Sequence, residues 1–106
     1  MVDISDFKKL EIKIGTVIES EAVPDTDKLI KLTIDFGEEK RTVLTAIREY
    51  FDPEYFIGKQ IPVLTNLEPK VLRGVESQGM ILAADNNGVP VLLHPEKEIP
   101  SGSKVL

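Results

Sequence analysis

Residues 66–84 read NLEPKVLRGVESQGMILAA and connect one predicted strand to the next. Within them, residues 68–78 show neither the alternation typical of a strand nor the apolar spacing of a helix. Two cations lie there, Lys70 and Arg73, and Gly74 follows the second. A bend at the glycine would present both cations and free backbone N–H groups to a phosphate. We therefore expect an irregular functional loop, the alternative being a solvated connection with ordinary surface charges.

Four strands are predicted before this loop, because apolar or β-branched residues alternate with polar ones. They cover residues 12–19, 30–36, 41–47 and 60–66. The third and fourth are separated by a short helix over Pro53–Ile57, for which Asp52 is a suitable N-cap. Near the N-terminus, Ser5 can cap a turn that places Phe7 and Leu10 over one end of a barrel.

A fifth strand is expected after the loop, over residues 80–84. The pair Asn87-Gly88 then favours a tight hairpin turn, and residues 89–93 would form the returning strand. These last residues exceed what a five-stranded barrel needs. We expect a C-terminal extension over about residues 86–106.

Three strands, a short helix and two strands are the order of the OB-fold, a five-stranded Greek-key barrel. The chain is therefore predicted to be a mainly β protein with one domain over residues 1–106. In this fold the loops after the first and fourth strands bind oligonucleotides. Here those loops are residues 20–28 and 67–78.

Composition excludes several kinds of site. The chain has no cysteine and one histidine, His94, which excludes disulfides, thiolate metal sites and histidine clusters. No apolar run approaches about 18 residues and the N-terminus has no hydrophobic segment, so we expect a cytoplasmic protein without a membrane span. Residues 75–79 approach the nucleophile-elbow pattern, but the first glycine is displaced and a strand follows instead of a helix. We expect no catalysis, no cofactor, no metal and no small-molecule substrate.

The net charge of −5 disfavours nucleic acid when it is taken alone, because affinity for phosphates rests on Lys and Arg. A local basic patch can nevertheless exist on an acidic protein. Many of the acids lie in stretches that need not face a ligand: Glu19, Glu21, Glu38, Glu39, Asp52, Glu54, Glu96 and Glu98.

Four stretches carry a resemblance to one family. They are DFKKLEIKIGTV (6–17), DTDKL (25–29), IGKQIPVLTNL (57–67) and the stretch 66–84 quoted above. Together they resemble the structure-specific tRNA-binding domain family. Its members include the C-terminal domain of bacterial methionyl-tRNA synthetases, a stand-alone dimeric tRNA-binding protein and endothelial-monocyte-activating-polypeptide-like domains. The resemblance covers most of the chain, which by its length looks most like a free-standing archaeal-type beta subunit of methionyl-tRNA synthetase.

The resemblance implies a tRNA site on the two loops. The candidate residues are Lys28, Asn66, Lys70, Arg73, Ser77, Gln78 and Met80, with Arg41 and Arg48 as weaker additions. From the residues alone each also has a structural alternative. From its position at the start of a strand Lys28 fits an ordinary surface lysine, Arg73 can pair with Glu76, and polar loop side chains can satisfy loop backbone. Met80 is a core residue by its pattern.

The function implied is a non-catalytic homodimer that binds tRNA by its shape and aids methionyl-tRNA synthetase in trans. Scarce aromatic residues suit this better than stacking on single strands. Apolar residues of the extension could form the dimer interface: Val89, Val91, Leu92, Leu93, Ile99 and Val105. Two alternatives stay open, a protein-export chaperone of the same fold and a dimerisation subunit of a synthetase that does not touch RNA.

Overall fold

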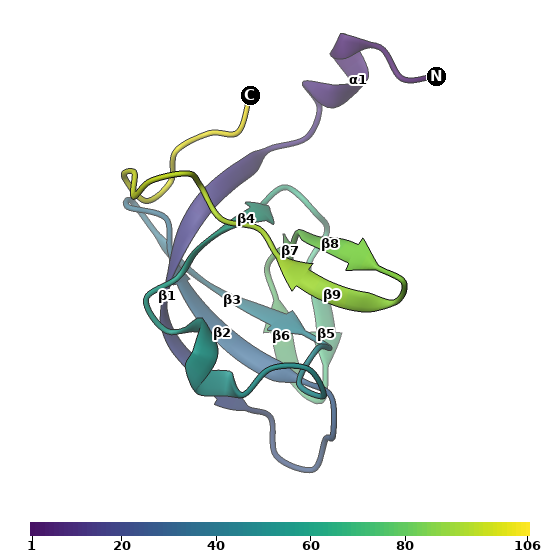
Figure 1. Ribbon diagram of the computed structural model, residues 1–106, viewed down its shortest axis with the longest axis vertical. Coiled ribbons are helices and arrows are strands. Elements are labelled where there is room, and N and C mark those ends of the chain that lie inside the picture. Colours follow the sequence, from purple (N-terminus) through teal and green to yellow (C-terminus); the bar gives the residue numbers. More distant parts are fainter.

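The alternating apolar residues are buried inside one curled antiparallel sheet. The computed structural model describes residues 1–106. Five strands lie in the order β3-β2-β1-β4-β7. Their bounds are Ile12–Ala22 (β1), Ile30–Asp35 (β2), Lys40–Thr45 (β3), Gln60–Leu64 (β4) and Met80–Ile81 (β7). The sheet curls into a nearly closed barrel (Figure 1), so the predicted mainly β, OB-type fold is confirmed.

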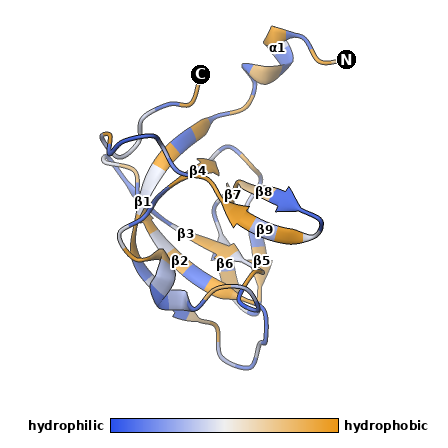
Figure 2. Ribbon diagram, in the orientation of Figure 1, coloured by the Kyte–Doolittle hydropathy of each residue, from blue (hydrophilic) through white to orange (hydrophobic).

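Tight packing inside the barrel depends on one glycine. A Cβ at Gly15 would lie 2.3 Å from Ile34 Cγ2 and 2.8 Å from Phe36 Cε1, so only glycine lets β1 pass this close to the core. The core cluster is made of Val17, Ile30, Leu32, Ile34, Phe36, Val43, Phe56, Ile61, Val63 and Ile81. In Figure 2 the ribbons of the barrel strands carry hydrophobic stretches interrupted by polar residues.

The C-terminal tail continues the pairing of β1. The backbone N–H of Ile14 donates to Ser103 O at 2.8 Å, and that of Val105 donates to Ile12 O at 2.8 Å. β1 also runs further than predicted, to Ala22, and carries a bulge in its pairing with β2. The first connecting loop is therefore residues 23–29 rather than 20–28.

Residues 68–78 are a hairpin, and the prediction of an irregular loop is wrong. β5 (Lys70–Leu72) and β6 (Val75–Ser77) pair through a two-residue turn. Both turn residues have positive φ, 51° at Arg73 and 77° at Gly74, which is the backbone of a hairpin turn that follows the twist of its strands. The strands have three residues each, too short for their alternation to be recognised.

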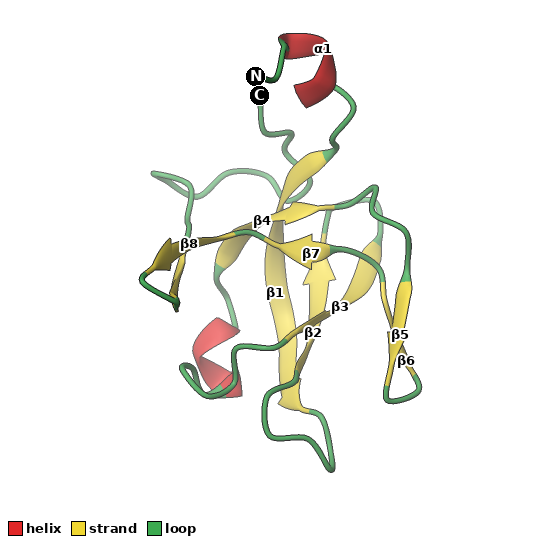
Figure 3. Ribbon diagram, turned by 90° about the vertical axis from the view of Figure 1, so that its right-hand side faces the viewer, coloured by secondary structure: helices red, strands yellow, loops and turns green.

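A second hairpin forms where it was predicted. β8 (Ala83–Asn86) and β9 (Val89–Leu92) pair around Asn87 and Gly88, with φ of 52° and 90°. The expected strand over residues 80–84 is split, because β7 ends at Ile81 before β8 begins. The hairpin therefore lies outside the five-stranded sheet (Figure 3).

The helix between β3 and β4 is the single 3-10 turn η1 (Pro53–Phe56). Phe56 is fully buried, which anchors this turn to the barrel. Asp52 occupies the predicted N-cap position with Pro53 directly after it, but the Asp52 side chain makes no capping hydrogen bond. No helix of the structure is long and apolar enough to span a bilayer.

Helix α1 (Ile4–Phe7) is capped by Asp3, not by Ser5. The Ser5 hydroxyl donates to the Asp3 carboxylate at 2.6 Å and, with the Asp6 N–H, lowers the pKa of that carboxyl. The helix projects beyond one end of the barrel (Figures 1 and 3) and buries none of its residues. The predicted plug of the barrel by Phe7 and Leu10 is therefore wrong.

Candidate functional site

Two connections meet at the end of the barrel opposite α1. Figures 1 and 3 place the 23–29 loop and the turn of the β5–β6 hairpin at this end. Between them lies a hollow of about 380 Å³. It is lined by Asp25, Thr26, Asp27, Lys28, Leu29, Ala46 and Arg73. Lys28 and Arg73, predicted to act together from two loops, therefore share one surface.

The 23–29 loop is held in place by its own polar contacts. The guanidinium of Arg48 donates to Thr26 O at 2.7 Å, and its backbone N–H donates to Lys28 O at 3.0 Å. The Thr26 hydroxyl donates to Val23 O at 2.8 Å. Arg48, a weaker candidate in the sequence, thus supports the loop that carries Lys28.

The candidate cations Lys28, Lys70 and Arg73 are exposed and form no ion pair. The ion pairs of the chain are Lys9–Asp6, Lys31–Glu21 and Arg41–Glu39. The alternative in which Arg73 is neutralised by Glu76 is therefore not realised. Unpaired cations at the rim of a hollow are suited to bind phosphate, because no internal pair must be broken first. Asp25 and Asp27 line the same hollow and limit how strongly anions are attracted to it.

Ser77 and Gln78 lie beside the cations but are engaged by the fold. Ser77 is 7% exposed, and its hydroxyl accepts from Leu44 N at 3.0 Å. The Gln78 side-chain oxygen accepts from Thr42 N at 3.1 Å, and its backbone N–H donates to Thr42 O at 2.8 Å. Both residues thereby attach the end of the hairpin to β3. Contact of Ser77 and Gln78 with RNA remains a prediction.

Asn66 and Met80 lie elsewhere. The Asn66 amide accepts from Glu11 N at 2.9 Å and donates to Lys9 O at 2.7 Å, which ties it to the segment leading into β1. Met80 pairs with Leu64 in the sheet, and its side chain is 46% exposed. The structure therefore brings Lys28 and Arg73 into one hollow, with Lys70 on the adjoining hairpin, and gives Asn66 a different surrounding.

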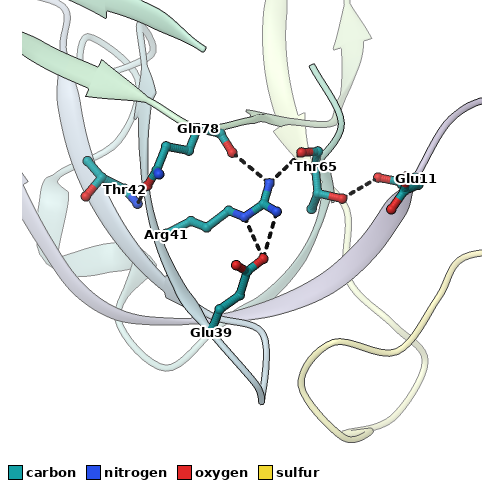
Figure 4. A network of polar contacts seen from close by, with 6 residues as sticks. All are labelled: Glu11, Glu39, Arg41, Thr42, Thr65 and Gln78. Carbon is teal, nitrogen blue, oxygen red and sulfur yellow. Dashed lines mark hydrogen bonds and ion pairs between the residues drawn. The ribbon is translucent and has the colours of Figure 1, made fainter. Parts of the chain in front are cut away.

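Arg41, a weaker candidate in the sequence, makes several polar contacts that hold the fold together. Its guanidinium donates to the backbone carbonyls of Thr65 and Gln78 and pairs with Glu39, as Figure 4 shows. The only signal in the sequence is the spacing of Glu39 and Arg41, two positions apart near the start of a strand, which puts their side chains on the same face.

The comparison with known families bears directly on these residues. The family described as "Putative tRNA binding domain" matches residues 12–104, which include the 23–29 loop and the β5–β6 hairpin.

The chain belongs to the tRNA-binding domain family.

Relatives of this tRNA-binding domain occur inside longer proteins. The chain is 50% identical over 104 residues to the Methionine–tRNA ligase of Archaeoglobus fulgidus. That match covers 98% of this chain and 16% of the ligase. The Methionine–tRNA ligase of Methanococcus aeolicus is 48% identical over 105 residues, again across 16% of its length. This tRNA-binding domain thus spans about a sixth of the curated relatives it matches.

Solved structures of similar length share the fold. A methionyl-tRNA-synthetase-related protein from Pyrococcus horikoshii superposes with a TM-score of 0.96 at 40% identity, and the match covers 100% of this chain and 98% of that one. The chaperone CsaA of Bacillus anthracis superposes with a TM-score of 0.89 at 36% identity over 100% and 99% of the two chains.

Proposed function

We propose that this chain is a non-catalytic module that binds folded tRNA through the hollow between the 23–29 loop and the β5–β6 hairpin. The observation that carries the proposal is that Lys28 and Arg73 line this hollow without forming an ion pair. Membership of a tRNA-binding family makes RNA backbone the anion to expect. Since the hollow is lined by two cations and by no aromatic side chain, the module reads the shape of tRNA rather than its bases.

A titration with RNA of two kinds tests this proposal. Folded tRNA should bind more tightly than an unstructured strand of equal length, whatever its anticodon. The dependence of the association constant on salt should correspond to roughly 2–5 phosphate contacts. Equal affinity for the unstructured strand would refute reading by shape.

We also propose that the module acts as a homodimer. Val89, Val91 and Leu93 are exposed on or beside β9, and in Figure 2 the ribbon of that strand is mostly in the hydrophobic colour. A second hollow, of about 210 Å³, lies between α1 and the tail and is mainly apolar. It is lined by Ile4, Phe7, Lys8, Leu10, Lys104, Val105 and Leu106. The Lys28–Arg73 hollow lies at the end of the barrel opposite α1, so pairing through α1 and the tail would leave it open.

In the cytoplasm such a dimer would aid methionyl-tRNA synthetase in trans. Support comes from the 50% identity to a segment of a Methionine–tRNA ligase and from the match to a synthetase-related protein of nearly equal length. Adding the purified protein to a synthetase that lacks such a domain should lower the KM for tRNA. An unchanged KM would count against the role in trans.

The second candidate function is that of a chaperone for extended polypeptide. The similarity to CsaA and the net charge of −5 favour it. The complete stretch RGVESQGM at residues 73–80 favours the tRNA function instead. Competition decides between them, because an unfolded polypeptide that displaces tRNA at micromolar concentration would support the chaperone.

A further inference from the structure

The hairpin that carries Lys70 and Arg73 is held at its base. We call residues 66–78 the arm. Its strands β5 and β6 form a sheet of their own and share no ladder of hydrogen bonds with the five-stranded sheet. The direction in which the arm points therefore depends on contacts near its two ends.

A single side chain contacts both ends of the arm. The Nη1 group of Arg41 donates to the backbone carbonyl of Thr65, just before the arm, and to that of Gln78, its last residue, at 3.3 Å. The guanidinium is itself held by Glu39, whose Oε1 accepts from Nε and lies 2.7 Å from Nη2. Figure 4 shows Arg41 between the three partners, where it bridges β3 to the two ends of the arm.

These contacts leave Arg41 little capacity to bind RNA itself. A guanidinium has five N–H groups. In Arg41 three of them donate to Thr65 O, Gln78 O and the Glu39 carboxylate. The Nη2 group also lies within ion-pair distance of that carboxylate. The side chain is 23% exposed. Phosphate binding would require the protein to give up an ion pair that is already formed.

We propose that Arg41 is a positioning residue, a clamp that fixes the base of the arm so that Lys70 and Arg73 face tRNA together with Lys28. This inference rests on the proposed function. Arginine is required because its planar fork reaches two carbonyls and a carboxylate at once, whereas an ammonium group presents a single charged centre. Ser77 and Gln78 fasten only the C-terminal end of the arm to β3.

A double-mutant cycle tests the clamp with tRNA as the ligand. Arg41→Met is made in the parent and in a Lys70→Ala/Arg73→Ala background, in which the arm has no cations. It should weaken tRNA binding about 5- to 10-fold in the parent and less than about twofold in the background. Arg41→Lys should recover only part of the loss. Lys31→Met is the matched control, since it removes a paired cation from β2 and should change affinity less than about twofold in either background.

Each outcome is decisive. Equal losses in both backgrounds would show that Arg41 acts independently of the arm cations and would overturn the clamp, and unchanged affinity in the parent would show that it positions nothing. If the Lys70→Ala/Arg73→Ala variant binds tRNA like the parent, the arm is not part of the tRNA site and the proposed function is wrong. This comparison does not involve Arg41, so it is distinct from a failure of the clamp.

Hydrogen exchange supplies an independent measurement. Arg41→Met should speed amide exchange in residues 70–77 and leave exchange in β2 unchanged, and unchanged exchange in the arm would overturn the clamp. Should Arg41→Met fail to fold, Glu39→Gln takes its place in the cycle. It weakens the hold on the guanidinium and should cost about 2- to 3-fold in the parent only.

Discussion

The hydroxyl of Ser77 accepts a hydrogen bond from the backbone N–H of Leu44 at 3.0 Å and lies 3.1 Å from Gly79 O, to which it donates. Ser77 belongs to β6 and Leu44 to β3, and these strands are in different sheets. The Ser77 side chain thus supplies a hydrogen bond between the two strands that a backbone carbonyl would supply within a sheet. The barrel is closed at this edge partly through the side chains of the stretch RGVESQGM.

Ser77→Ala should therefore lower stability. The substitution leaves the buried N–H of Leu44 without its partner, so the free energy of unfolding should fall by about 1–3 kcal/mol in urea denaturation. Ser5→Ala, at an exposed position, should stay within about 0.5 kcal/mol of the parent. A Ser77→Ala variant of parental stability that has lost tRNA affinity would instead establish direct contact with RNA.

Lys28→Ala and Arg73→Ala should each weaken tRNA binding by about 1–2 kcal/mol, the scale of a charge-assisted hydrogen bond. Arg73→Lys should recover part of the loss if the guanidinium binds bidentately or stacks. Binding titrations measure these effects, and thermal melts should show little change because both side chains are exposed.

The control for these two cations is Lys97→Ala. Lys97 lies in the tail near Glu96 and Glu98, away from the hollow, and its removal should leave tRNA affinity almost unchanged. Parental affinity in both Lys28→Ala and Arg73→Ala would place the binding site elsewhere on the surface.

Val91→Asp should separate the proposed dimer. Val91 is 45% exposed on β9, so the monomer tolerates a carboxylate there, while an apolar interface does not. Sedimentation at micromolar concentration should give the mass of two chains for the parent and of one chain for the variant. Val71→Asp is the control: it changes the same residue type at a position that is 63% exposed on the arm, and the variant should remain dimeric. A monomeric parent would contradict the homodimer.

The strands were predictable from the sequence because each buries one face. Residues 30–35 alternate between buried and half-exposed positions along the whole of β2, and such alternation is the direct signature of a pleated strand. The second hairpin was equally predictable, since Asn87-Gly88 is a turn that few other sequences favour as strongly. Both features are encoded by residues that are adjacent in the sequence.

Features that depend on partners distant in the chain were not predictable. Arg41 contacts residues 24 and 37 positions away, and Ser77 contacts one 33 positions away, distances at which a single sequence gives no pairing signal. The sequence predicts a loop in place of the arm because Arg-Gly is an uncommon choice for a hairpin turn. The co-location of Lys28 and Arg73 was predictable only through the fold, which brings the two connections to one end of the barrel.

Arg73 has a positive φ of 51°, a backbone conformation that glycine or asparagine adopts with less strain. Adopting it costs the arginine about 1 kcal/mol of stability. Neither of those residues can present a cation from the tip of the hairpin. The turn thus carries a cation at the expense of some of its own stability. Replacing Arg73 by glycine or asparagine to raise thermal stability would relax the turn, but it would also remove a cation from the proposed tRNA site.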